Sequence, residues 1–263
     1  MLFLLSPAKS LDYDTPATLR SATRPKFIAE SAALIEILKT RTADEIGELM
    51  NLSPALASLN AQRYAAWSRT FNAKNSKPAV LAFNGDVYDG LNAKTLGEAD
   101  LAWAQQHVAI LSGLHGVLRP LDRLQPYRLE MGTALPTPRG RNLYEFWGDS
   151  IAEHLNARVA ADPSPVIVNL ASQEYFRAAD RKSLKPRIIE CVFEDWKGGR
   201  YKVISFFAKR ARGLMARYAI TKRVAAPRSL ERFQADGYAF DAAASDPDRL
   251  VFRRRVESGK IAG

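Results

Sequence analysis

The sequence predicts an α+β fold (mixed α/β), in which a mixed β-sheet is surrounded by helices. Two observations predict it. Short apolar runs of strand length alternate with helical segments over the first 170 residues. A hairpin signal, Lys197-Gly198-Gly199, then separates two β-rich runs before a long basic helix. A chain of 263 residues with 47% hydrophobic residues can bury a core, and we expect one domain over residues 1–263.

The first half of the chain is expected to begin with a strand and continue with helices. Residues 2–5 form a short apolar run that ends at a proline, and residues 8–25 form a long polar connection. Apolar periodicity then predicts helices at residues 26–39, 43–50, 54–68 and 98–106. Short apolar runs predict strands at residues 79–83, 107–112 and 127–131.

The second half is expected to add the rest of the sheet. Residues 143–160 have the pattern of one amphipathic helix, and residues 166–170 that of a buried strand. The hairpin joins strands at residues 187–196 and 200–207, and the second strand leads into a basic helix at 208–223. Short strands are expected at residues 238–240 and 250–255.

The positive charge of the chain is concentrated in one segment. The net charge is +10, and residues 197–232 contain eleven Lys and Arg residues against one acid, Glu231. The rest of the chain is therefore neutral. Such a segment is either a solvated face or a surface for a polyanion. Because the whole excess of positive charge lies in this one segment, a binding surface is favoured, and we expect double-stranded DNA as the partner.

Two helices at residues 42–68 resemble a helix-hairpin-helix, a motif that holds the DNA backbone. Ser53 is a favourable N-cap and Pro54 a favoured first helical residue. Free N–H groups at such a helix start can bind a phosphate without contacting bases. The alternative is a plain helical hairpin, because Asn51 and Ser53 stand where this motif usually has glycines.

The basic helix supplies most of the other candidate DNA contacts. Arg210, Gly213 and Arg217 lie on one face, and the glycine allows either a phosphate or another backbone to come close. The candidate DNA-binding residues are Asn51, Ser53, Lys202, Lys209, Arg210, Arg212, Arg217, Lys222 and Arg223.

Polar residues follow the apolar strands, where a ligand crevice forms in α/β sheets. The candidate pocket residues are Ser6, Lys9, Asn84, Asp86, Tyr88, Ser112, Arg119, Arg128, Glu130, Asn169, Ser172 and Glu174. Lys9 or Arg119 could hold a small anionic or nucleotide-like ligand, and Asp86 or Glu174 could act as general acid or base. The catalytic candidates are Asp86, Glu174 and Lys9. The alternative is turn chemistry, which favours the same residue types.

Several classes of protein are disfavoured by what the sequence lacks. It contains no Walker A, GxGxxG, GxSxG or HExxH motif, so we expect no cofactor. The single cysteine, Cys191, and three scattered histidines give no metal-ligand spacing, so we expect no metal site. No apolar run reaches the ~20 residues that span a bilayer, and we expect a cytoplasmic protein that does not bind membranes.

Seven ordered segments resemble the YaaA peroxide-stress family over nearly the whole chain. They are LSPAKSLD at residues 5–12, AFNGDVY at 82–88, LSGLHGVLRPLD at 111–122, PYRLEMG at 126–132, FWGD at 146–149, NLASQEYF at 169–176 and FAKRARGLM at 207–215. Asn84 and His115 depart from the pattern, which has Lys and Tyr there. The resemblance implies an uncommon fold with a helix-hairpin-helix and a positively charged cleft. It also implies a peroxide-stress role that limits DNA damage and unincorporated iron.

Three hypotheses of function remain open. The leading one is a protein of the peroxide response that binds double-stranded DNA and protects it. The second is an enzyme that acts on a nucleobase or nucleotide in the strand-end pocket. The third is an iron-handling protein, for which the sequence offers no recognisable ligand set.

Overall fold

A computed structural model describes residues 1–17, 19 and 21–255. Within these residues the main sheet has nine strands, in the order β11-β12-β13-β9-β8-β1-β5-β6, with β10 paired to β9. The strands are β1 (Leu2–Leu5), β5 (Val108–Ser112), β6 (Gly116–Leu118), β8 (Val166–Leu170), β9 (Arg187–Lys197), β10 (Arg200–Lys202), β11 (Gln234–Ala235), β12 (Tyr238–Phe240) and β13 (Arg249–Arg254). Parallel and antiparallel pairs both occur, which confirms the predicted mixed sheet.

The centre of the sheet is formed by three parallel strands. β1 lies between β8 and β5 and pairs in parallel with both. Its four apolar residues are buried, as are all five residues of β5 and of β8. Continuous apolar runs are typical of parallel strands that are covered on both faces. Because the three strands are parallel, their carboxyl ends lie at the same edge of the sheet.

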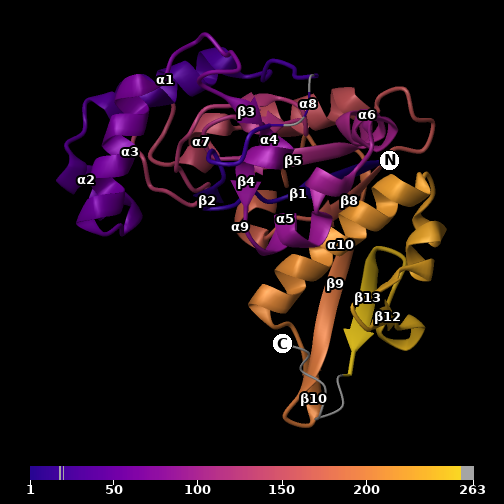
Figure 1. Ribbon diagram of the computed structural model, residues 1–263. Helices are drawn as coiled ribbons and strands as arrows, with labels where there is room; N and C mark the ends of the chain where they lie inside the picture. The colour runs from indigo at the N-terminus through magenta and orange to yellow at the C-terminus, as the bar shows by residue number, and fades with distance from the viewer. Residues whose placement is uncertain (18, 20, 256–263) are drawn as a thin grey trace.

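The C-terminal third extends this sheet and then projects from it. β9 alternates buried and half-buried residues along most of its length, which is typical of a strand with one covered face. β8 and β13 pair with β9 in parallel, whereas β10 pairs with it in antiparallel register. The end of β9 and β10 form a hairpin that extends beyond the body of the molecule, at the bottom of Figure 1.

Helices surround the sheet (Figure 1). They are α1 (Ile28–Lys39), α2 (Ala43–Met50), α3 (Pro54–Ala66), α4 (Ala79–Ala82), α5 (Asp86–Leu91), α6 (Glu98–His107), α7 (Leu143–Trp147), α8 (Ser150–Val159), α9 (Gln173–Phe176) and α10 (Ser205–Lys222). Short 3₁₀ helices cover Ala93–Thr95, Pro227–Arg232 and Ala242–Ala244. One buried hydrophobic cluster includes residues from Leu2 to Phe252, so the sheet and its helices share a core.

Helices α2 and α3 form a helical hairpin on the left of Figure 1. A capping box fixes the start of α2, since Thr42 accepts a hydrogen bond from the Glu45 N–H and Glu45 accepts one from the Thr42 N–H. Asn51 ends α2 in a left-handed conformation, and Ser53 caps α3 by accepting from the Leu56 N–H. The predicted helix at residues 43–50 is confirmed, and the one at 54–68 ends at residue 66.

Several predicted elements differ from the structure in their type or their extent. Residues 79–82 form the single helical turn α4 rather than a strand, and residues 127–131 contain no strand. Residues 143–160 form two helices, because Gly148 takes a left-handed conformation (φ 49°) between α7 and α8. The second hairpin strand ends at residue 202, because α10 already begins at Ser205.

Two small ladders tie the long N-terminal connection to the body. β2 (Ser10–Leu11) pairs with β4 (Phe83–Asn84), and β3 (Lys77–Pro78) pairs with β7 (Arg123–Leu124). The β2–β4 ladder places the segments around residues 6–11 and 83–86 side by side. In the part of the chain that the structure describes, no helix has the length and apolar character needed to cross a membrane.

Candidate functional site

A cavity lies beside the carboxyl ends of the central strands, with a volume of about 430 Å³. Ser6 follows β1 and Ser172 follows β8, and both line it. Eight of the twelve predicted pocket residues line this cavity. They are Ser6, Lys9, Asn84, Asp86, Arg128, Glu130, Ser172 and Glu174. The topology explains this grouping, because parallel strands bring their carboxyl ends to one edge.

Short hydrogen bonds hold the two strand ends together at the cavity. The Ser172 N–H donates to Ser6 Oγ at 2.8 Å, and the Ser6 hydroxyl donates to Ser172 Oγ at 3.3 Å. Beside them, the hydroxyl of Tyr88 donates to the Ser6 carbonyl at 3.0 Å. Asn84 reaches the cavity through the β2–β4 ladder rather than from a strand of the main sheet. This part of the wall is therefore fixed by hydroxyl hydrogen bonds and by the β2–β4 ladder.

Glu130 is neutralised by two basic residues of the cavity wall. Its carboxylate contacts Lys9 Nζ at 2.8 Å and Arg128 Nη2 at 3.0 Å. The Nε of Arg128 is buried and has no hydrogen-bond partner among the described residues. Lys9, Arg128 and Glu130 thus form one ion-paired group that keeps one excess positive charge, and Lys9 is engaged in an ion pair.

The other two carboxylates of the cavity are less constrained. Glu174 accepts a hydrogen bond from the Gly132 N–H at 2.9 Å. Asp86, at the first position of α5, is half-buried, and within residues 1–17, 19 and 21–255 its side chain has no hydrogen-bond or ion-pair partner. An unpaired carboxylate in a cavity can accept a proton or a hydrogen bond from a ligand.

Helix α10 supplies two further cations to the same cavity. Lys209 and Arg212, which were predicted to bind DNA, line the cavity. Neither forms an ion pair with an acidic residue in the described chain. Arg212 is half-buried, and burial lowers the pKa of its guanidinium, against the raising effect of nearby Glu190. The basic helix and the strand-end pocket therefore meet at one site.

The phenols around the cavity are neutral. Burial raises the pKa of Tyr127 and Tyr175, which line it, and that of Tyr88 behind it. The Tyr127 hydroxyl lies 2.6 Å from Ser112 Oγ. These groups can donate hydrogen bonds but carry no charge. Tyr127 was not among the predicted pocket residues, although it stands in a segment that resembles the YaaA pattern.

Four predicted pocket residues do not line the cavity. Tyr88 and Ser112 support its wall through the hydrogen bonds to Ser6 and Tyr127. Asn169 is buried in β8, and its Oδ1 accepts from the Ala171 N–H, which shapes the strand end. These three residues act behind the surface rather than on it. Arg119 lies in a separate polar network.

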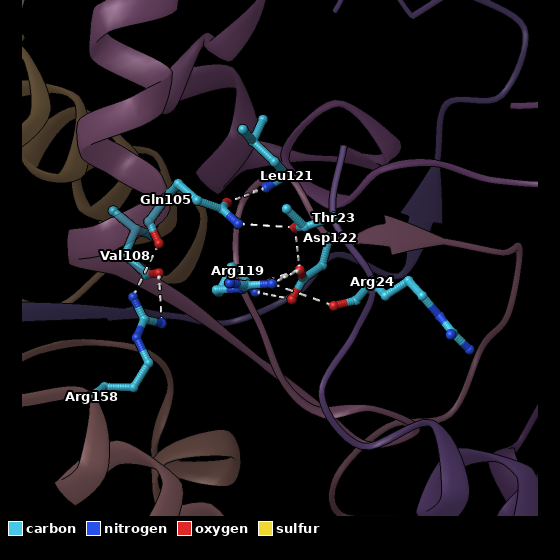
Figure 2. A network of polar contacts seen from close by, with 8 residues as sticks. All are labelled: Thr23, Arg24, Gln105, Val108, Arg119, Leu121, Asp122 and Arg158. Carbon is cyan, nitrogen blue, oxygen red and sulfur yellow. Dashed lines mark hydrogen bonds and ion pairs between the residues drawn. The ribbon is translucent and has the colours of Figure 1, made fainter. Parts of the chain in front are cut away.

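The network around Arg119 joins the N-terminal connection to the loop after β6 (Figure 2). Buried Asp122 accepts hydrogen bonds from Arg119 Nε and Nη2 and from the Thr23 hydroxyl. Gln105 at the end of α6 donates to Thr23 Oγ1 and accepts from the Leu121 N–H. Nearby, Arg158 donates to carbonyls at the end of α6. The expectation that Arg119 binds an anion in the pocket is wrong, because Arg119 lies outside the cavity and its guanidinium pairs with Asp122.

Several of the proposed DNA contacts on α10 are engaged within the protein. Arg210 pairs with Asp236 at 2.9 Å, and Arg223 pairs with Asp100 at 2.8 Å. Arg217 donates to the carbonyls of Leu91 and Asn92, at the end of α5. Of the two roles open for Gly213, the structure shows the close approach of another backbone, that of α5. The face of Arg210, Gly213 and Arg217 is thus largely an internal packing face.

The remaining basic residues stay accessible. Lys202 is half-exposed on β10, and Lys222 is exposed in the last turn of α10. Lys197 and Arg200 are exposed at the tip of the hairpin. This tip and the start of α10 keep their positive charge available to a ligand.

The α2–α3 hairpin has a different electrostatic character. Asn51 and Ser53 are exposed at its tip, as expected, but α2 carries Asp44, Glu45 and Glu48. Between residues 42 and 68 the only basic residue is Arg63. Negative charge at this position disfavours a phosphate backbone. In Figure 1 the α2–α3 hairpin and the β9–β10 hairpin lie well apart.

No group of three or more His, Cys, Asp or Glu residues with a geometry suited to a metal ion occurs in the described part of the chain.

Comparison with known proteins supplies the family. The profile described as peroxide stress protein YaaA matches residues 1–244. A UPF0246 protein of Paracidovorax citrulli is 68% identical over 256 residues, which cover 97% of this chain and 99% of that protein. A UPF0246 protein of Bordetella petrii is 65% identical over 256 residues, covering 97% of this chain and 100% of that protein. The chain therefore belongs to the peroxide stress protein YaaA family, and its role lies in the peroxide stress response.

Proposed function

We propose that the protein binds DNA during the peroxide stress response, through the phosphate backbone. The observation that carries this proposal is the meeting of the basic helix with the strand-end cavity, at Lys209 and Arg212. Neither cation has an ion-pair partner among the described residues. Unpaired lysines and arginines on a basic surface are the groups that neutralise backbone phosphates.

The proposed contact surface consists of the β9–β10 hairpin and the start of α10. Lys197, Arg200 and Lys202 lie on the hairpin, and Lys209 follows in the second turn of α10. The hairpin extends beyond the body of the molecule (Figure 1), so a duplex can approach it without a clash with the helices. The acidic α2–α3 hairpin and the internally paired Arg210 and Arg217 take no part in this contact.

The test is a charge reversal that leaves internal contacts intact. In a mobility-shift or anisotropy assay, the triple variant Lys197→Glu, Arg200→Glu and Lys202→Glu should lose at least tenfold in duplex affinity. Each phosphate contact that is lost should reduce the slope of log affinity against log salt by about 0.9. Lys197 and Arg200 are exposed and Lys202 is half-exposed, and none of them has an ion pair within the described residues, so the fold should persist.

A matched control changes the same amount of charge elsewhere. Lys74, Lys182 and Lys185 are exposed and have no ion-pair partner in the described chain. Both triple variants have the same net charge, so they differ only in where the charge is reversed. If the hairpin is the contact surface, the control variant should lose far less affinity than the hairpin variant. Equal affinity of the two variants, or a hairpin variant that binds like the unmodified protein, would refute this surface.

A second candidate function is an enzyme that acts on a nucleobase or nucleotide. Asp86 favours it, because its carboxylate is half-buried in the cavity and unpaired in the described structure. Such a group can act as general acid or base on a bound base. Product analysis on a panel of lesion-bearing duplexes should then show turnover that Asp86→Asn abolishes. An absence of turnover across the panel supports binding alone.

A further inference from the structure

The crossing of α5 and α10 brings opposite charges to one cavity without pairing them. Gly213 of α10 packs against the carbonyl of Val87 in α5. Arg212 and Asp86 are the residues immediately before these two, and both line the cavity. Among the residues that the structure describes, neither side chain has a hydrogen-bond or ion-pair partner. A cation and a carboxylate are therefore both available to a ligand at this place.

The cationic side of the cavity fits a phosphate. Lys209 and Arg212 are three residues apart, so they are neighbours on the surface of α10. Lys209 is exposed and Arg212 is half-buried, and both line the cavity. The other two cations of the wall, Lys9 and Arg128, already pair with Glu130. A guanidinium offers a planar set of donors that matches a phosphate, and an ammonium adds a second charge.

Two other groups determine what else the ligand must carry. An ionised carboxylate only accepts hydrogen bonds, so Asp86 requires a donor such as an amine. Ser6 Oγ accepts from the Ser172 N–H, and the Ser6 hydroxyl donates to Ser172 Oγ. The hydroxyl hydrogen of Ser172 is therefore left to donate to the ligand.

The size and the walls of the cavity limit the ligand to a small molecule. Its volume of about 430 Å³ lies within the range of small-molecule sites. A duplex, whose major groove alone is about 12 Å wide, is too large to enter. Apolar side chains and two phenols complete the lining, namely Pro7, Ala8, Val87, Leu129, Tyr127 and Tyr175. A nucleoside monophosphate combines an anion, a donor and a planar part that suits such walls.

We infer that the cavity binds a nucleoside monophosphate, with its phosphate held by Lys209 and Arg212 and a donor group of its base held by Asp86. This ligand goes beyond the DNA proposal, because Lys197, Arg200 and Lys202 of the hairpin do not line the cavity. It supplies a binding step for the second candidate function but requires no turnover. The terminal nucleotide of a DNA strand carries the same groups and is the other source of this chemistry.

The experiment is isothermal titration calorimetry with the full chain. The small probes are dAMP, deoxyadenosine without phosphate, and deoxyribose 5-phosphate without base. Binding of dAMP should be saturable and at least about tenfold tighter than that of the other two, because each of them lacks one of the recognised groups. A blunt duplex and the same duplex with one unpaired 5′-phosphorylated adenine identify the source. Tighter binding of the second duplex assigns the site to DNA ends, and equal binding assigns it to the free nucleotide.

Three variants and one matched control test the named groups. Arg212→Gln and, at an exposed position that does not disturb the fold, Lys209→Gln should each lower the affinity for dAMP about tenfold. Asp86→Asn should lower it to a similar extent and leave binding of deoxyribose 5-phosphate unchanged. Lys222→Gln removes the same charge from the last turn of the same helix, where Lys222 is exposed, and should leave the affinity for dAMP unchanged.

The outcomes separate this inference from the DNA proposal. Duplex binding without saturable binding of dAMP overturns the inference and leaves the proposal in place. The inference is also overturned if Arg212→Gln and Lys209→Gln bind dAMP like the unmodified protein, or if deoxyribose 5-phosphate binds as tightly as dAMP. The hairpin variant Lys197→Glu, Arg200→Glu and Lys202→Glu should lose the duplex and keep dAMP. Binding of dAMP without binding of either duplex supports the cavity site and refutes the DNA proposal.

Discussion

Gly213 of α10 lies so close to Val87 of α5 that a Cβ atom on the glycine would be 1.8 Å from the Val87 carbonyl oxygen. The contact is reciprocal, since a Cβ on Gly90 of α5 would be 2.1 Å from the Arg210 carbonyl oxygen. The two helices therefore cross backbone to backbone. This crossing fixes Asp86, on α5, relative to Arg212, on α10, across the cavity.

The substitution Gly213→Ala should destabilise the fold by about 3 kcal/mol or more. Alanine in a helix normally gains about 0.5–1 kcal/mol over glycine. Here the new methyl group would overlap main-chain atoms that cannot rotate away, so the helices must separate. Denaturant unfolding of both proteins would measure the difference in the free energy of unfolding.

Gly47→Ala is the matched control for that prediction. Gly47 lies in α2, and a Cβ there would meet Ala57 Cβ at 3.4 Å and the Leu52 carbonyl at 3.6 Å, which are close to ordinary contact distances. We expect a change between zero and a gain of about 1 kcal/mol in unfolding free energy. Equal losses in the two variants would contradict the packing account of Gly213.

Asp122→Ala should also weaken the fold, by about 3 kcal/mol, without affecting ligand binding. The buried carboxylate accepts hydrogen bonds from Thr23 and from Arg119 (Figure 2). Removal leaves these donors unpaired, although the partial exposure of Arg119 moderates the loss. Unfolding curves and duplex affinities of the same preparation check both parts. Reduced affinity in a folded variant would show that the network reaches the binding surface.

Stability should fall when the pH is lowered from 7.5 to 5.5. Burial lowers the pKa of His115 to about 3, and burial followed by repulsion from Arg158, Lys26 and Arg119 lowers the pKa of His154 to about 4. Both histidines stay neutral in the folded state, while the unfolded chain takes up protons below pH 6.5. Each histidine therefore costs about 1.4 kcal/mol at pH 5.5.

Unfolding free energies at several pH values would measure this loss. The loss from these histidines should begin near pH 6.5 and level off below their folded pKa values. His154→Gln should remove about half of the drop between pH 7.5 and 5.5. A drop of the same size in this variant would assign the acid sensitivity to other groups.

Cys191 should not react with peroxide in the folded protein. Its side chain is 3% exposed, and burial raises the pKa of the thiol well above its usual range. Because the thiolate is the reactive form, oxidation of this residue is blocked. Thiol titration should find no reactive group in the native protein and one in guanidinium. Cys191→Ser should preserve protection against peroxide, and loss of protection would reveal a redox role.

Part of the fold was predictable because its signals are local. The N-cap residue Ser53 and the break at Asn51 were visible in the sequence and set the α2–α3 hairpin, whereas the Thr42 capping box was found only in the structure. The apolar run at residues 2–5 forms a strand, as predicted. The run at residues 79–82 is also four apolar residues long but forms a helical turn. Apolar composition alone does not separate these two outcomes.

The cavity was predictable in outline because polar residues follow parallel strands. Chain order could not show that Lys209 and Arg212 would join Asp86 there, since this depends on how α10 crosses α5. Chain order also could not show that Arg119 would form an ion pair with Asp122 instead of lining the cavity. Long-range pairing decides which charges remain available to a ligand, and a single sequence does not contain it.

The position of β1 between β5 and β8 bears on how the chain folds. Leu2–Leu5 find their partners only at residues 108–110 and 167–170. At a synthesis rate of about 5–20 residues per second, this apolar segment remains uncovered for about 10 seconds or more during translation. Contacts so distant along the chain also slow folding. We expect the nascent protein to depend on chaperones until its eighth strand has left the ribosome.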